Sequence, residues 1–540
     1  MDRRGRSLLV VALAVLAIGA LVPATAAATT PATAATSTAA ATTTAATTTA
    51  ATSAATPATT TTAATSTATP TPPATTPTNH STNTSLGCVD GICHDDPINV
   101  TQVDGLDAAE RDRLLARSMA RVEYLRGEPF TESVPVQVVD SETFGREQLT
   151  PNSSDPRYTR WNDQVWKALF IVGDNTSTQT AITETLTGSV NGLYSPRRDE
   201  IVIVADDPES PRISEATLIH ELTHALQDQR HDLTSPRFSG DTQDADLAVT
   251  GLYEGEAGYI EALYRQRCDD DRWRCQRASP TSGDGGATNR GILTVVLQPY
   301  SDGPGYVHEI VTTEGWAGVD ERMADPPTTT SEIIHREPID PHSVDPPSTA
   351  TAGWQRYTEP GRNGTEVAGE ASIFVMFWYQ ATTARADTVD PGTLYESEGE
   401  YDSRTYSAPP SDGWAGDALV PYRRGDDDGY VWTTEWGTPG DAAEFHRAYT
   451  AILTARNATA TDPGIYELDD AFAGAYGIER DGTRVRIVHA PTTDGLRELD
   501  PGLEPSATSD QIPGFGIAGA LLALLAAGWA LAWPATRQRE

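Results

Sequence analysis

Two histidines four residues apart, His220 and His224, are the residues of this chain best suited to chemistry. On a helix, side chains at positions i and i+4 point the same way, so the two imidazoles can bind one divalent metal ion. Glu221 follows the first histidine, and its carboxylate can lie beside that metal and act as general base on a bound water. The spacing His-Glu-x-x-His therefore predicts the core of a zinc-hydrolase site.

The residues around this motif predict a buried helix that follows a β-hairpin. Residues 190–194 and 200–204 flank a polar turn, which indicates the hairpin. Ser214 is placed to cap the N-terminus of the helix. Apolar residues then recur at helical spacing, at Ala216, Leu218, Ile219, Leu222, Ala225 and Leu226.

A catalytic zinc ion needs three protein ligands and an open position. His231 lies seven residues past the second histidine, whereas the metzincin pattern places its third histidine six residues on, after a glycine where Gln227 stands here. A second helix predicted over residues 245–264 offers Glu254 and Glu256 instead. These two glutamates lie about 200° apart on a helix, so they cannot both face one metal without local distortion.

The string HELTHA at 220–225 resembles the thermolysin-type motif of the gluzincins, zinc peptidases whose third ligand is a glutamate on the helix after the metal helix. The string EGEAGYIE at 254–261 is similar to the segment of zinc aminopeptidases in which the glutamate before the glycine binds zinc. This resemblance implies Glu254 as the third ligand. The thermolysin-type arrangement, in which alanine directly follows the ligand, favours Glu256. We expect Glu254.

The resemblance extends over about residues 100–490, to a group of exported His-Glu-x-x-His proteins. Their further features are found here as HALQDQRHDL at 224–233, PPTTTSEIIHREP at 326–338, GEASIFVMF at 369–377, GWAGD at 413–417 and WTTEWGTPGDAAEF at 432–445. These segments carry no assigned chemistry. The resemblance implies a zinc peptidase acting on peptides or proteins, and leaves the particular substrate open.

A zinc peptidase also needs a hydrogen-bond donor for the developing oxyanion. His335, His308 and Tyr306 are candidates by residue type alone. Zinc chemistry is not specific to amides, so the site by itself would suit other hydrolyses. The alternatives to catalysis are a non-catalytic surface protein with a structural zinc site or a binding face, and a cell-envelope component without metal.

The N-terminus has the layout of an export signal. Three arginines precede an apolar run and a stretch of small residues, which predicts a signal peptide over residues 1–28. Residues 29–85 are mostly Ala, Thr, Ser and Pro, cannot bury a core, and are expected to be a disordered, extended segment. The mature protein is therefore expected outside the cytoplasm.

The C-terminus predicts attachment to the cell membrane. After a linker at 501–511, the apolar stretch at 512–535 is long enough to cross a bilayer and is followed by arginines. Its opening Pro-Gly-Phe resembles the PGF-CTERM signal of haloarchaeal surface proteins, in which an archaeosortase removes the helix and a lipid anchor replaces it. A retained transmembrane helix is the alternative, and both place the protein at the cell surface.

The composition agrees with an exported protein of a salty environment. The net charge is −37, and Lys167 is the only lysine among 39 basic residues. Such a surface does not favour nucleic acid, and it predicts folding that depends on salt. Cys88 with Cys93 and Cys268 with Cys275 are expected to form two disulfides, and seven Asn-x-Ser/Thr sequons permit glycosylation.

The foldable region exceeds one typical domain, so we expect two lobes of an α+β protein that share one site. The first, residues 100–275, is the zincin-like lobe with the metal helices. The second, residues 276–495, is expected to be mostly helical, with its best helices at 367–383 and 441–454 and a closing strand at 484–488.

Overall fold

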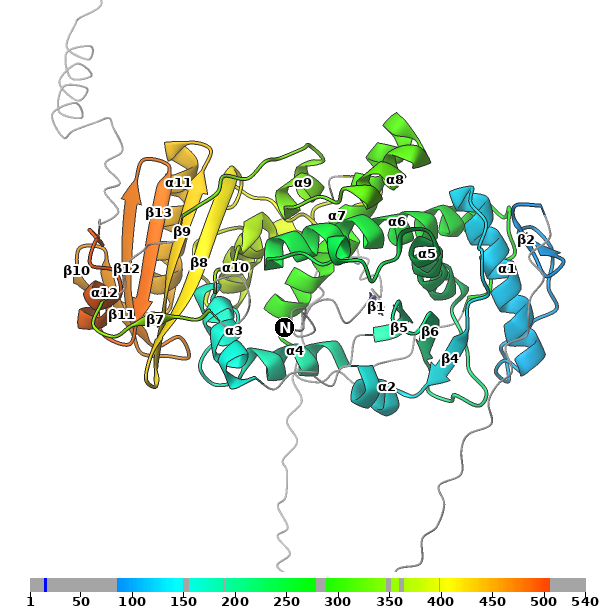
Figure 1. Cartoon of the computed structure of the whole chain (residues 1–540), viewed down its shortest axis with the longest axis horizontal. Coiled ribbons are helices and arrows are strands. Elements are labelled where there is room, and N and C mark those ends of the chain that lie inside the picture. The colour runs from blue at the N-terminus through cyan, green and yellow to red at the C-terminus, as the bar shows by residue number, and fades with distance from the viewer. Residues whose placement is uncertain are drawn as a thin grey trace, which may run out of the picture. The chain divides into compact units, whose positions relative to one another are not determined.

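The computed structural model of the chain has the mixed α+β fold that the sequence predicts (Figure 1). It describes residues 14–16, 85–148, 155–187, 190–277, 288–345, 351–358, 364–397 and 399–505. The predicted sorting signal at 512–535 lies outside these ranges, as do most of the predicted signal peptide (1–28), nearly all of the 29–85 segment and part of the 501–511 linker. Within the described ranges, no helix is both long and apolar enough to cross a bilayer.

The first sheet has four strands in the order β1-β5-β6-β4. The predicted hairpin is confirmed, and its strands are β5 (Val190–Ser195) and β6 (Glu200–Val204). On the other side of β6 lies the parallel strand β4 (Val136–Val139). The short strand β1 (Ala14–Leu16) pairs antiparallel with the outer edge of β5.

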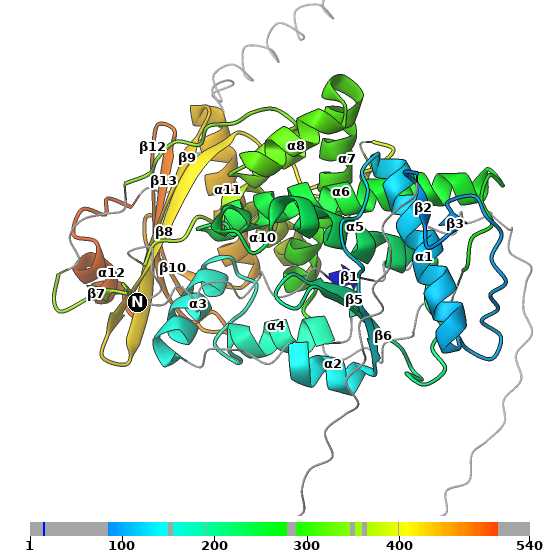
Figure 2. The same ribbon diagram turned by 45° about the vertical axis from the view of Figure 1, so that its right-hand side comes forward.

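The predicted metal helix is α5 (Glu215–His231), and the predicted second helix is α6 (Gln243–Asp269). Ser214 caps α5 as predicted, because its side chain accepts a hydrogen bond from the Thr217 backbone. Figures 1 and 2 both show α5 between the first sheet and α6. The other elements of the first half are β2 (Cys88–Val89), β3 (Ile92–Cys93), α1 (Ala108–Arg126), α2 (Ser141–Gln148), α3 (Pro156–Ala168), α4 (Thr178–Thr187) and the 3-10 turn η1 (Pro236–Phe238).

Helix α7 (Arg290–Glu314) packs on α6 at backbone contact distance. A Cβ atom on Gly255 would lie 2.4 Å from the carbonyl oxygen of Gly303, and one on Gly303 would lie 2.3 Å from that of Gly251. Side chains larger than hydrogen would therefore push the two helices apart. The helices α8 (Trp316–Ala324) and α9 (Thr330–His335) follow α7.

The second sheet has seven antiparallel strands, in the order β10-β11-β12-β13-β9-β8-β7. Their bounds are β7 (Gln355–Arg356), β8 (Trp414–Arg424), β9 (Asp427–Trp436), β10 (Thr459–Asp462), β11 (Ile465–Leu468), β12 (Gly474–Asp481) and β13 (Arg484–Ala490). The helices of this part are α10 (Gly369–Thr383), α11 (Pro439–Ala455) and α12 (Thr493–Leu499), with a 3-10 turn η2 (Thr393–Tyr395).

The prediction of a mostly helical second lobe is wrong for residues 355–495, which are organised around this sheet. The predicted helices at 367–383 and 441–454 and the predicted strand at 484–488 are confirmed. The long strands β8 and β9 were missed because both faces of the sheet are covered. One face packs in a core with α10 and α11 and the other in a core with α12, so buried residues run through β8 without alternation.

Helix α3 lies early in the chain but packs in the core of the second sheet. Trp161 and Trp166 are buried there with residues of α10, α11 and β9. The Trp161 indole donates a hydrogen bond to the carbonyl oxygen of Gly364 at 3.1 Å, and Arg160 forms an ion pair with Asp428 in β9. The first core instead gathers α1, the first sheet, α5, α6 and α7.

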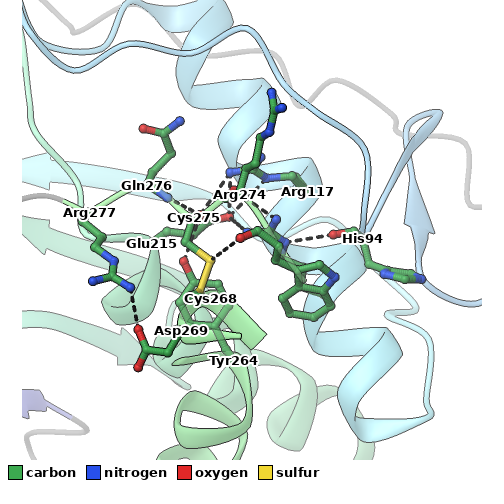
Figure 3. The surroundings of a disulfide bond; sticks show 12 residues. His94, Arg117, Glu215, Tyr264, Cys268, Asp269, Arg274, Cys275, Gln276 and Arg277 are labelled. Carbon is green, nitrogen blue, oxygen red and sulfur yellow. Dashed lines mark hydrogen bonds and ion pairs between the residues drawn. A yellow bond between two sulfur atoms is a disulfide. The ribbon is translucent and has the colours of Figure 1, made fainter. Parts of the chain in front are cut away.

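Both predicted disulfides are confirmed, and one of them flanks the first residue of α5. Figure 3 shows Glu215 beside the Cys268–Cys275 disulfide. Its buried carboxylate forms ion pairs with Arg117 and Arg121 of α1, at 3.0 and 2.7 Å. It also accepts hydrogen bonds from the Tyr264 hydroxyl and the Gln276 backbone, at 3.0 and 2.8 Å. Glu215 therefore joins the start of α5 to α1, α6 and the disulfide loop.

We expect Glu215→Gln to destabilise the fold by about 3–5 kcal/mol, because it leaves two buried guanidiniums without their counter-charge. Denaturant unfolding in molar salt measures this change. The matched control is Glu142→Gln, which removes an exposed Glu142–Arg146 pair and should change stability little. Equal effects of the two substitutions would contradict the role assigned to Glu215.

Candidate metal centre

Helix α5 presents His220 and His224 on its buried face, four residues apart, with ring centroids separated by 4.9 Å. Their side chains face α6, which packs against α5. Ile219 and Leu222 pack into the first core. The apolar stripe thus fixes the rotation of α5 and sets the direction of both imidazoles.

Glu254 of α6 meets both imidazoles. Its atom Oε2 lies 3.0 Å from His220 Nε2 and 3.2 Å from His224 Nε2. All three side chains are buried, and one ligand atom from each lies within 4.8 Å of the other two. The structure therefore brings together the three residues that the sequence predicts as metal ligands.

The second ring nitrogen of each histidine has its own partner. His220 Nδ1 lies 3.2 Å from Glu261 Oε2, and His224 Nδ1 lies 2.9 Å from Gln227 Oε1. Because both partners are oxygen acceptors, each Nδ1 carries a proton and each Nε2 is directed at Glu254. Such outer contacts orient metal-binding histidines and raise their basicity.

Glu256 is held away from the two histidines. Its atom Oε1 pairs with Arg126 Nε of α1 at 2.5 Å, and Oε2 accepts a hydrogen bond from the Gln227 amide at 2.8 Å. Gln227 in turn contacts His224. Glu256 therefore reaches the histidines only through Gln227 and is not placed to be a metal ligand. The geometry favours Glu254 over Glu256 as the ligand.

Burial and charge set the protonation of this cluster. Burial by itself lowers the pKa of His220, but hydrogen bonds to Glu254 and Glu261 outweigh it and raise that pKa to about 10. Burial by itself raises the pKa of Glu254, whereas the imidazoles of His224 and His220 lower it to about 2. Without metal, the cluster is thus a buried ion pair between an imidazolium and a carboxylate.

This donor set fits a zinc ion. Two imidazole nitrogens and one carboxylate oxygen are the three protein ligands of many catalytic zinc sites. His224 Nε2 is buried and lies 3.2 Å from Glu254 Oε2, but the two atoms do not have the geometry of a hydrogen bond. A buried polar atom in this state is costly, and coordination of a cation would satisfy it.

Glu221 lies next to strand β5 of the first sheet. Its side chain is fully buried, and a Cβ atom on Gly192 of β5 would lie 3.1 Å from its Oε1. Glycine at this position therefore lets the β5 backbone approach the carboxylate closely. The predicted general base lies between the metal helix and a strand that runs past it.

Tyr300 of α7 belongs to the site and was missed by sequence reasoning. Its hydroxyl donates a hydrogen bond to Glu254 Oε1 at 2.8 Å, and its ring stacks on His220. Burial and the charge of Glu254 raise the pKa of this phenol well above its usual value, so it stays a donor. The available signal was the set of glycines at 251, 255 and 303, which bring α7 against α6.

The donors suggested by sequence lie elsewhere. Tyr306 donates to Glu332, His308 contacts the Tyr259 hydroxyl, and His335 pairs with Glu370. His231, which the sequence analysis rejected as the third metal ligand, lies near Asp320. None of these four contacts is with the three residues of the cluster.

Residues 355–500 match a family described only as a domain of unknown function (DUF8575). This range holds the second sheet with α10, α11 and α12. No curated protein and no solved structure matches the chain. The family match therefore leaves α5, α6 and all residues of the metal cluster outside its range.

We expect metal affinity to rise with pH by about tenfold per unit from about pH 6 to about pH 9. The metal must displace the proton of His220, whose raised pKa keeps it protonated below about 10, whereas Glu254 is already ionised. Competition with a chelator of known proton affinity measures the slope. An affinity that stays constant over this range would contradict the paired state described above.

The two glutamates of α6 provide a matched pair of substitutions. Glu254→Gln should abolish metal binding, because it removes a ligand. Glu256→Gln should keep the metal and weaken its affinity by about 10–100-fold, because it disturbs the Gln227 contact behind His224 and removes the charge that pairs with Arg126, but removes no ligand. Metal content after dialysis separates the two outcomes. The reverse pattern would assign the ligand role to Glu256.

Proposed function

We propose that this protein is a zinc-dependent peptidase in which His220, His224 and Glu254 hold the metal and Glu221 is the general base. The observation that carries the proposal is the meeting of both Nε2 atoms on one oxygen of Glu254, at 3.0 and 3.2 Å, inside a buried site. The same geometry supports the zincin-like character of the first half.

The residues around the metal have separable tasks. Zinc bound here supplies a Lewis acid that polarises a carbonyl and lowers the pKa of water. Glu221 accepts the proton of the attacking water and returns it to the leaving nitrogen. The Tyr300 phenol, which remains protonated, would donate to the oxyanion that develops on the substrate by turning its single O–H away from Glu254 Oε1.

The outer edge of β5 supports peptides as the substrate class. This edge pairs antiparallel with β1, whose residues lie within the predicted export signal at 1–28, in the register Ala14↔Leu193 and Val15↔Gly192, so removal of the signal would leave the edge open. Gly192 is also the residue that approaches Glu221. An extended peptide that pairs with the same edge would place its backbone beside the general base.

We further propose that this peptidase lies outside the cell and is anchored to the membrane at its C-terminus. The two disulfides support an oxidising compartment. The export signal at 1–28 and the signal at 512–535, cleaved by an archaeosortase-type enzyme or retained as a helix, supply the route and the anchor. The net charge of −37 argues against a nucleic-acid partner.

Comparison of the wild-type chain with Glu221→Gln, in multimolar salt on a mixed peptide library, tests the proposal. We expect zinc in both proteins and cleavage that falls by about 10²–10⁴-fold in the variant. Glu209→Gln is the control, because this exposed carboxylate lies outside the site. Zinc in both with cleavage in neither would indicate a non-catalytic binding protein, and a folded protein without zinc would refute the metal site.

A further inference from the structure

A second group of metal-type ligands lies apart from the site on α5 and α6. His335, Glu370 and Asp412 each offer one ligand atom, and these atoms lie within 4.8 Å of one another. The three residues come from α9, from the first turn of α10 and from the turn before β8. They also fall in or next to three segments that the sequence analysis left without chemistry, at 326–338, 369–377 and 413–417.

Glu370 forms the buried base of this group. Its side chain is only 1% exposed, and His335 Nε2 lies 3.0 Å from each of its two carboxylate oxygens. The Ser407 hydroxyl donates to Oε1 at 3.1 Å, and the Ser331 hydroxyl donates to Oε2. The carboxylate is thus built into the fold by two hydroxyls, and its remaining side faces the imidazole.

Two negative charges meet at this point. Asp412 brings a second carboxylate within 4.8 Å of the buried one, and the His335 imidazole beside Glu370 offsets their repulsion only when it is protonated. The adjacent guanidinium of Arg336 is directed to Asp402 instead. A divalent cation bound by both carboxylates and the imidazole would neutralise the repulsion.

We propose that His335, Glu370 and Asp412 form a second divalent-metal site, suited to a first-row transition ion such as Zn²⁺. One imidazole nitrogen with two carboxylates favours such an ion over Ca²⁺ or Mg²⁺, which prefer oxygen alone. His335 is about one-third exposed and Asp412 is exposed, so water can complete the coordination.

This second site would join two parts of the chain. Glu370 and Asp412 lie within the range matched by the family of unknown function, whereas His335 precedes it. Next to Glu370, the backbone of Gly369 donates to Asp417 of β8, and Thr330 of α9 donates to Asp244 of α6. The metal would therefore tie the matched region to α9 and, through α9, to the helix that carries Glu254.

Metal stoichiometry of the full-length chain tests this proposal, with Zn²⁺ and Co²⁺ as probes. We expect about two equivalents in the wild type and about one in the double variant His220→Ala/His224→Ala. Adding His335→Ala or Asp412→Asn to the double variant should remove the remaining equivalent and its stabilisation of the fold against heat. Glu337→Gln, an exposed carboxylate two residues past His335, should leave it unchanged.

The outcomes separate the two sites. A wild type with one equivalent that disappears in the double variant would overturn the second site and leave the proposed peptidase intact. One equivalent that survives the double variant but not His335→Ala would support the second site and remove the metal from α5. Because both His335 and Asp412 are exposed, the circular dichroism spectra of their variants should match that of the wild type. A variant that folds less completely than the wild type would be detected by its spectrum.

Discussion

A fully buried carboxylate has to be compensated, and in this protein Glu254 is compensated by two imidazoles from a neighbouring helix. That requirement fixes how α5 and α6 pack, because a small rotation of either helix would leave the charge without its partners. It also explains why α6 has two different faces. One face presents Glu254 to α5, and the other has glycine at 255, against Gly303 of α7, so that α7 can bring Tyr300 to the same carboxylate.

The cluster of His220, His224 and Glu254 was predictable from sequence because it depends on local spacing. His220 and His224 are four apart in one helix, and Glu254 lies in a second amphipathic segment. The choice between Glu254 and Glu256 was open because the sequence does not say which face of α6 meets α5. It is decided by Arg126, more than a hundred residues away, which binds Glu256. Tyr300 was missed because its segment contains Pro299 and Pro304, which are untypical of a helix interior.

In the fold, too, the elements that depend on local spacing were predictable, and those that depend on contacts between distant residues were not. The helices α5, α6, α10 and α11 and the first hairpin were predictable from periodicity and capping residues, with ends that differ by a few residues. The second sheet was not, apart from β13. Its long strands are buried on both faces, so alternation does not mark them, and β8 also contains Pro421. Pairings between distant strands follow from the whole chain and leave no local signature.

The packing of α3 shows that the region matched by the family model is smaller than the region that folds around the second sheet. The region matched as a domain of unknown function begins at residue 355, yet Trp161 and Trp166 fill its core and Gln380 donates to the carbonyl oxygen of Phe170. Residues 355–500 alone would expose to solvent the apolar surface that Trp161 and Trp166 cover in this chain. The helix α3 is therefore part of the unit that folds around the second sheet, although it lies outside the range of the family match.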